Sequence, residues 1–172
     1  MFVREHTSIC VPLVHLVFKQ NGCMYIVMQH IDAPTLEQQW DNLDEDMRAT
    51  SASQSGEALR QLLALENPTS RPRPLNNTKC CGPWFAMYDA GPFENHSSLV
   101  HWLNHKIEAT AKHAEKFTEN YRLVFTHQDL ALRNLMLDKK AQLWIIDWEL
   151  AGWYPAYFEY ACVASMVPTV PD

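Results

Sequence analysis

The chain has 172 residues, of which 47% are apolar, so it can form one domain, or one domain with a small additional lobe, around a hydrophobic core. Its formal net charge is -6, which argues against the clustered lysine and arginine of a nucleic-acid or anionic-membrane surface. The absence of an 18-residue apolar run and of a secretory signal, together with five cysteines that form no C-x-x-C pair, favours a cytoplasmic protein with reduced thiols.

The first half of the chain predicts a β-hairpin followed by two helices. Two apolar runs in residues 13 to 28 flank Asn21 and Gly22, which tolerate the positive φ angles of a tight turn. In residues 33 to 43, "APTLEQQWDNL", the apolar residues then recur at helical spacing. A second helix is expected over residues 44 to 66, although the serine-rich stretch from 50 to 56 weakens its middle.

The second half predicts a loop, a helix and three short strands. Residues 67 to 83 hold four prolines and form the loop, and Ser97 or Ser98 is expected to cap the helix that follows. Strands are expected up to Phe125, over residues 135 to 137 and over residues 143 to 146. The aromatic segment after them is expected to be partly helical and mainly to fill a core. This order of strands and helices predicts an α+β fold.

Four polar residues stand out beside these strands: His127, Asp129, Asn134 and Asp147. Asp129 and Asn134 belong to one loop, and the turn at residues 138 to 140 can fold Asp147 back beside it. Carboxylate and amide oxygens suit Mg²⁺, which prefers a few oxygen ligands together with waters and substrate phosphates. The remaining carboxylate, that of Asp129, can then orient a hydroxyl or accept its proton, as phosphoryl transfer requires.

The pattern H-x-D-x-x-x-x-N, followed thirteen residues later by an aspartate, resembles the catalytic loop and metal-binding aspartate of kinases. Its surroundings, "FTHQDLALRNLML" and "IIDWELAGWYPAYFEY", resemble the aminoglycoside phosphotransferase and choline kinase group, and its fungal members most of all. The stretches "YIVMQHIDAPTLEQQW" and "GPFENHSSLVHWL" resemble the same group, so the resemblance covers most of the chain.

The resemblance implies a role for each of these residues. Asp129 would be the catalytic base, Asn134 and Asp147 would bind magnesium, and His127 would mainly support the loop. The segment formed by Met28, Gln29, His30 and Ile31 would be the hinge whose backbone meets an adenine. Gln128 stands where the group often has glycine or another small residue, so its side chain is expected to crowd the loop.

The resemblance also implies a protein-kinase-like fold of the aminoglycoside phosphotransferase type, with a truncated N-terminal lobe. Residues 1 to 33 would be the remnant of that lobe with its hinge, and residues 34 to 172 a mainly helical C-terminal lobe that carries the catalytic loop. The phosphate-binding loop, its lysine and the glutamate partner of that lysine would lie upstream of Met1. The five glycines are too dispersed to cradle a phosphate.

Two functions are therefore expected from different classes. The first is ATP- and Mg²⁺-dependent phosphoryl transfer to a hydroxyl of a small molecule, by an enzyme or a shortened relative of one. The alternative is a repurposed kinase fold that uses no ATP and binds a metabolite or performs acid–base chemistry such as cyclisation or dehydration. A pseudokinase interaction module is the weaker third possibility. A homodimer is expected in either case, because a fold with both ends cut exposes apolar surface.

Overall fold

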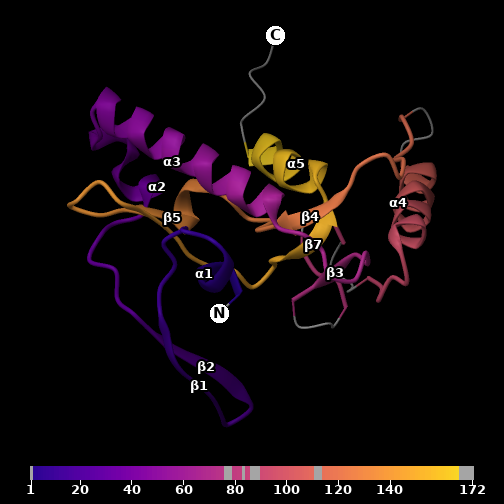
Figure 1. Ribbon diagram of the computed structural model, residues 1–172, viewed down its shortest axis with the longest axis horizontal. Coiled ribbons are helices and arrows are strands. Elements are labelled where there is room, and N and C mark those ends of the chain that lie inside the picture. Colours follow the sequence, from indigo (N-terminus) through magenta and orange to yellow (C-terminus); the bar gives the residue numbers. More distant parts are fainter. Residues whose placement is uncertain (1, 76–78, 83, 86–89, 111–113, 167–172) are drawn as a thin grey trace. The chain divides into compact units, whose positions relative to one another are not determined.

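The computed structural model describes residues 2–75, 79–82, 84–85, 90–110 and 114–166 (Figure 1). The chain forms two compact units: the first comprises Met1–Gln61 and Ala131–Asp147, and the second Leu62–Leu130 and Trp148–Asp172. These units are defined by which parts of the chain pack together, and they do not test the lobe boundary expected after residue 33. That boundary stays a prediction. In the described part of the chain, no helix is both long and apolar enough to cross a bilayer.

The first unit contains the predicted β-hairpin. Helix α1 (Phe2–His6) precedes strands β1 (Val14–Gln20) and β2 (Cys23–Met28), which pair antiparallel. Asn21 and Gly22 form the turn with φ angles of 51° and 82°, as the sequence predicts. Aromatic rings of the two strands stack across the ladder, because Phe18 lies opposite Tyr25 with 5.1 Å between ring centroids.

Both helices predicted next are present, with different lengths. Helix α2 (Leu36–Gln39) begins at a capping box between Thr35 and Gln38, and the segment continues as the 3-10 turn η1 (Trp40–Asn42). Helix α3 (Glu45–Ala64) runs unbroken through its serine-rich middle. The hydroxyls of Ser51 and Ser55 are satisfied there, because they donate hydrogen bonds to backbone carbonyls three and four residues earlier.

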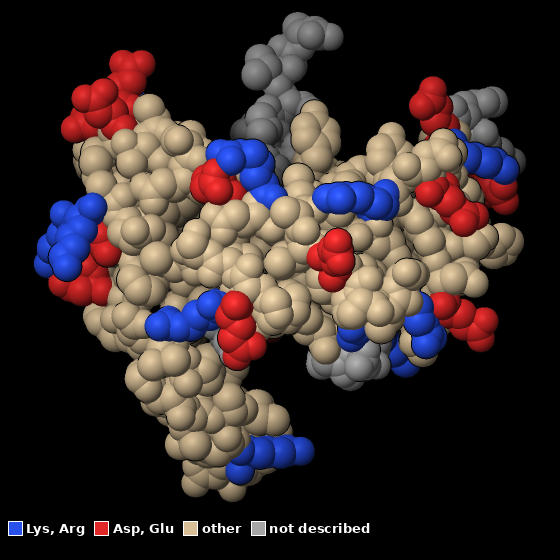
Figure 2. Space-filling model, viewed as in Figure 1, with Lys and Arg blue, Asp and Glu red and all other residues tan. Residues whose placement is uncertain are grey.

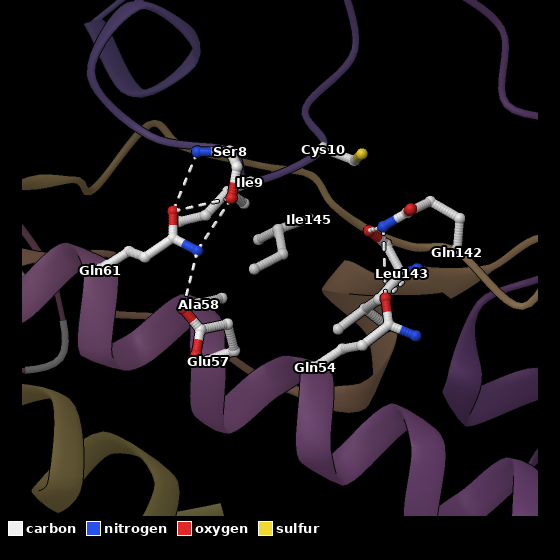
Figure 3. Close-up of a pocket in the computed structure, with 10 residues that line it drawn as sticks. All are labelled: Ser8, Ile9, Cys10, Gln54, Glu57, Ala58, Gln61, Gln142, Leu143 and Ile145. Carbon is white, nitrogen blue, oxygen red and sulfur yellow. Dashed lines mark hydrogen bonds between the residues drawn. The ribbon is translucent and has the colours of Figure 1, made fainter.

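Two glutamines of α3 attach this helix to the rest of the first unit. Gln61 accepts hydrogen bonds from the backbone N–H and hydroxyl of Ser8, and Gln54 donates to the carbonyl of Ala141 at 2.7 Å. Figure 3 shows both side chains at the edge of a cavity of about 110 Å³ between α3 and the facing segments. Because their amide groups are paired within the protein, this cavity is part of the packing of α3 and is a poor candidate for a ligand site.

The short strands β5 (Leu135–Leu137) and β6 (Leu143–Ile145) form a second antiparallel hairpin in the first unit. The turn between them is held by Asp138, whose carboxylate accepts hydrogen bonds from the backbone N–H groups of Lys140 and Gln142 and from the indole N–H of Trp144. The hydrogen bond from Trp144 is the largest cause that lowers the pKa of Asp138.

The second unit is built on a three-stranded antiparallel sheet. Its central strand is β7 (Gly152–Pro155), with β3 (Arg73–Pro74) on one side and β4 (Leu123–Thr126) on the other. The sequence predicts β4 but misses β7, since every residue of β7 is buried and no alternation marks it as a strand. Helix α5 (Tyr157–Met166) follows β7 and supplies the expected helical part of the aromatic segment.

Helix α4 (His96–Thr110) also belongs to the second unit, and its start corrects the predicted cap. The capping residue is Asn95, whose side chain accepts the N–H of Ser98 at 2.9 Å, while the Ser98 hydroxyl accepts the N–H of Asn95. Ser98 is therefore the third residue of the helix in a reciprocal cap, because a preceding asparagine takes the capping position.

The core of the second unit is aromatic, as the sequence predicts. Trp153, Tyr154 and Phe158 are at most 2% exposed, and Phe85 packs on Tyr154 with ring centroids 5.4 Å apart. Leu99 and Leu103 of α4 complete this cluster. Trp153 and Tyr154 are thus core residues and do not line an open pocket, whereas Trp148 is half-buried.

Candidate active site

The candidate site begins where β4 ends. Thr126 and His127 are fully buried, and the ring of Trp148 lies edge-on to the imidazole with 4.6 Å between centroids. The backbone N–H of Asp129, which is half-buried, donates to Nδ1 of His127 at 3.2 Å. Nδ1 is therefore the acceptor nitrogen of this histidine, and its buried ring orients the backbone that carries Asp129.

A residue that the sequence reading missed, Glu159, holds the same loop from α5. Its Oε2 accepts the backbone N–H of His127 at 2.6 Å and that of Gln128 at 3.1 Å. Its Oε1 is buried and has no hydrogen-bond partner among the residues that the structure describes. Burial raises the pKa of Glu159 above its ordinary value, although the two backbone donors oppose that rise. The signal in the sequence is a single carboxylate in the aromatic stretch "YFEYAC".

Gln128 occupies a backbone conformation that usually favours glycine. Its φ is 65°, yet its side chain is fully buried and donates from Nε2 to the carbonyl of Leu150 at 2.8 Å. Space for it exists beside Gly82, where a Cβ atom would lie 3.4 Å from Oε1 of Gln128. The side chain of Gln128 is therefore accommodated within the second unit, between Gly82 and Leu150.

Asn134 and Asp147 lie at one end of the β5–β6 hairpin in the first unit. Strand pairing sets Leu135 opposite Ile145, and the backbone N–H of Ile146 donates to the carbonyl of Asn134 at 3.0 Å. Asn134 and Asp147 therefore both lie near the Leu135–Ile145 pair, at the end of the hairpin away from its turn. Asn134 is 5% exposed, whereas Asp147 is exposed and has a φ of 61°.

The expected hinge follows β2 in the first unit. The backbone N–H of Gln29 donates to Leu13, and Ile31 is buried. Gln29, His30 and Ile31 border a cavity of about 250 Å³, whose other side is formed by the β5–β6 turn and Trp144. This places three of the four expected adenine-contacting residues beside a cavity.

The predicted residues lie close in the backbone as two pairs. His127 and Asp129 form one pair in the second unit, and Asn134 and Asp147 form the other in the first unit. The meeting of these pairs in one site stays a prediction. Among the described residues, no three His, Cys, Asp or Glu side chains group as a metal site of those residue types. Asparagine is not one of those residue types, so this finding does not bear on Asn134.

A β-hairpin, a catalytic-type loop after a buried strand and a second hairpin that follows it in the chain are the parts of a protein-kinase-like fold of the aminoglycoside phosphotransferase type. Solved structures agree with this class. Aminoglycoside phosphotransferase APH(4)-Ia matches 95% of this chain and is matched over 58% of its own, with a TM-score of 0.61 and 15% identity. The ADP-bound aminoglycoside phosphotransferase APH(2'')-Ib matches 94% of this chain and is matched over 56% of its own, with a TM-score of 0.56 and 14% identity.

The chain belongs to the phosphotransferase enzyme family, whose model matches residues 3–172. A complex of APH(2'')-IIa with gentamicin has the same fold, with a TM-score of 0.55 and 15% identity over 94% of this chain and 55% of that one. The chain therefore spans a little over half the length of these solved structures. No curated protein matches the sequence.

Proposed function

We propose that this chain takes part in ATP- and Mg²⁺-dependent transfer of a phosphoryl group to a hydroxyl of a small molecule. The observation that carries the proposal is the pair formed by Asn134 and Asp147 at one hairpin end, within a chain whose catalytic-loop pattern also supplies Asp129. Membership of the phosphotransferase family and the fold of the aminoglycoside phosphotransferases support it.

In this proposal each residue has a defined task. Asp129 orients the substrate hydroxyl and accepts its proton, and His127 and Glu159 fix the backbone of the loop that presents it. Asn134 and Asp147 supply oxygen ligands for Mg²⁺, which when bound with ATP neutralises the charge on the phosphates. The hinge residues Gln29 to Ile31 border the cavity proposed for the adenine.

The alternative, a protein that binds a metabolite without ATP, rests on the same loop, in which His127 and Glu159 hold the backbone that carries Asp129. The buried loop residues could still present Asp129 to a bound metabolite for acid–base chemistry.

Nucleotide binding separates the two functions. We expect ATP with MgCl₂ to raise the thermal unfolding temperature of the full chain, since saturation at about 100 times Kd stabilises a folded protein by about 2.7 kcal/mol. Asp147→Asn should remove the Mg²⁺-dependent part of this shift. Asp46→Asn, which alters an exposed carboxylate at the start of α3, is the matched control and should retain it.

The transfer step is tested separately by following ADP release with a panel of hydroxyl-bearing compounds, aminoglycosides among them. Asp129→Asn should still bind ATP with Mg²⁺ but lose transfer by about a hundredfold or more, as expected when a general base is removed. If neither ATP nor ADP changes the unfolding temperature, while a metabolite that is not a nucleotide does, phosphoryl transfer is the wrong function for this chain.

A further inference from the structure

The two faces of the β5–β6 hairpin differ in their surroundings. Side chains alternate between the faces along each strand. One face is at most 5% exposed and consists of Leu135, Leu137, Leu143 and Ile145. Met136 and Trp144 pair with one another across the hairpin, lie on the other face and are half-buried. Trp144 also lines the cavity of about 250 Å³ that the hinge residues border, so the hairpin contributes a large aromatic residue to this cavity.

Trp144 is held in a defined orientation by its own hairpin. Its indole N–H donates to Oδ2 of Asp138 at 3.0 Å. The backbone beside it is tied to the N-terminal segment, because the N–H of Ile145 donates to the carbonyl of Cys10 at 2.9 Å. The indole N–H is the only polar group of a tryptophan side chain, and here it is satisfied within the protein. The ring can therefore meet a ligand only through its apolar surface, and it loses little freedom on binding.

The carboxylates that line this cavity are paired within the protein. Asp138 accepts three hydrogen bonds from its own hairpin. Asp32 of the hinge segment forms an ion pair of 2.8 Å with Lys139 of the β5–β6 turn, so one residue from each wall of the cavity takes part. On the face drawn in Figure 2, basic and acidic side chains likewise lie mostly beside one another. The cavity is therefore better suited to an uncharged ring than to a phosphate group.

The size and the place of the cavity fit the base end of a nucleotide. Sites for drug-sized ligands measure about 300–1,000 Å³, so a cavity of about 250 Å³ suits a single ring system. Trp144 precedes Asp147, the proposed magnesium ligand, by three residues, and three residues of chain span at most about 11 Å. The ribose and phosphates of a nucleotide can cover that distance from a base that lies against Trp144.

We propose that Trp144 recognises the base of the nucleotide by stacking and makes the site selective for purine over pyrimidine nucleotides. This inference rests on the proposed function, because it assigns a further residue to the same nucleotide site. An aromatic side chain attracts every base through its ring face, and the strength of stacking then decides between bases. The two fused rings of a purine cover more of an indole than the single ring of a pyrimidine.

Isothermal titration calorimetry of the full chain with MgCl₂ and either ATP or CTP tests the proposal. We expect wild type to bind ATP more tightly than CTP. Trp144→Leu should weaken ATP binding by about tenfold, because it removes a contact between the base and an aromatic ring. Trp144→Phe keeps a ring and should retain most of the affinity. Trp40→Leu is the matched control and should bind as wild type does, since Trp40 is also half-buried in the first unit but does not line the cavity.

Tryptophan fluorescence provides a second readout that does not depend on folding of the leucine variant. ATP should change the fluorescence of wild type, and the change should be much smaller in Trp144→Phe although this variant still binds ATP. If ATP binds wild type and Trp144→Leu equally, or changes the fluorescence of wild type and Trp144→Phe equally, the inference is overturned and the proposed function stands. If neither nucleotide binds wild type, the proposed function fails and the inference fails with it.

Discussion

At the scale of single residues, the loop between β4 and β5 contains a strained residue, Gln128, which three hydrogen bonds hold in place. Gln128 has a φ of 65°, a conformation that costs a non-glycine residue about 1–3 kcal/mol. Its N–H donates to Glu159, its side chain donates to Leu150, and its carbonyl accepts the thiol of Cys162 at 3.1 Å. Strain that is fixed from three directions is typical of a site whose geometry matters for function.

Glu159 makes the stability of this loop dependent on pH. Its folded pKa is raised above 4.5 by burial, so its contribution to stability is complete below the unfolded pKa and is lost as pH rises through the folded pKa. In urea titrations, the unfolding free energy of wild type relative to Glu159→Gln should therefore fall as pH increases from about 4.5. An opposite slope would mean that the backbone donors outweigh burial.

At the scale of secondary-structure elements, the sheet of the second unit depends on close approach of β3 to β7. Pro74 lies opposite Gly152, and a Cβ atom on Gly152 would be 2.5 Å from the carbonyl oxygen of Arg73 and 2.8 Å from Cα of Pro74. Backbone atoms cannot rotate away as a flexible side chain can. A glycine is therefore required here for steric reasons, although its φ is an ordinary one.

Two glycine-to-alanine substitutions should consequently have opposite effects. Gly152→Ala should lower the unfolding free energy by about 2–3 kcal/mol, because it overpacks the contact between β3 and β7. Gly56→Ala, in the middle of α3 with open space around the new methyl group, should raise it by about 0.5–1 kcal/mol. Chemical denaturation monitored by circular dichroism measures both changes in the unfolding free energy. If Gly152→Ala changed it no differently from Gly56→Ala, β3 would not approach β7 closely.

At the scale of the whole molecule, the five cysteines are free thiols in very different surroundings. Cys23 is exposed, whereas Cys80 and Cys162 are fully buried and desolvation raises the pKa of each of them to about 11. Because the thiolate is the reactive form, the two buried cysteines report on opening of the second unit.

Thiol labelling at pH 8 followed by peptide mass mapping should therefore modify Cys23 first. Cys80 and Cys162 should remain unmodified until urea unfolds the chain, and their labelling should follow the unfolding curve. Cys23→Ser removes the fast phase and provides the control. Rapid labelling of Cys162 under native conditions would show that the support of the catalytic-type loop opens locally.

The sequence alone determined the features that depend on residues close together in the chain. The Asn21–Gly22 turn, the approximate bounds of α3, the strands β4 to β6 and the aromatic core all follow from local pattern, and the motif around Asp129 was sufficient to indicate the family. Local pattern failed at β7, whose uniform burial carries no alternation, and at the cap of α4, where Asn95 outcompetes the neighbouring serines.

Only the tertiary structure decided the contacts between residues far apart in sequence. Glu159 lies more than 30 residues from the loop that it supports, and Gly82 lies beside the side chain of Gln128 from a different segment. The exposure of β2 likewise depends on which strands lie beside it, since its apolar sequence is typical of a buried strand. Hydrogen-bond partners and steric room are properties of chain segments brought together by folding, so no periodicity within one segment encodes them.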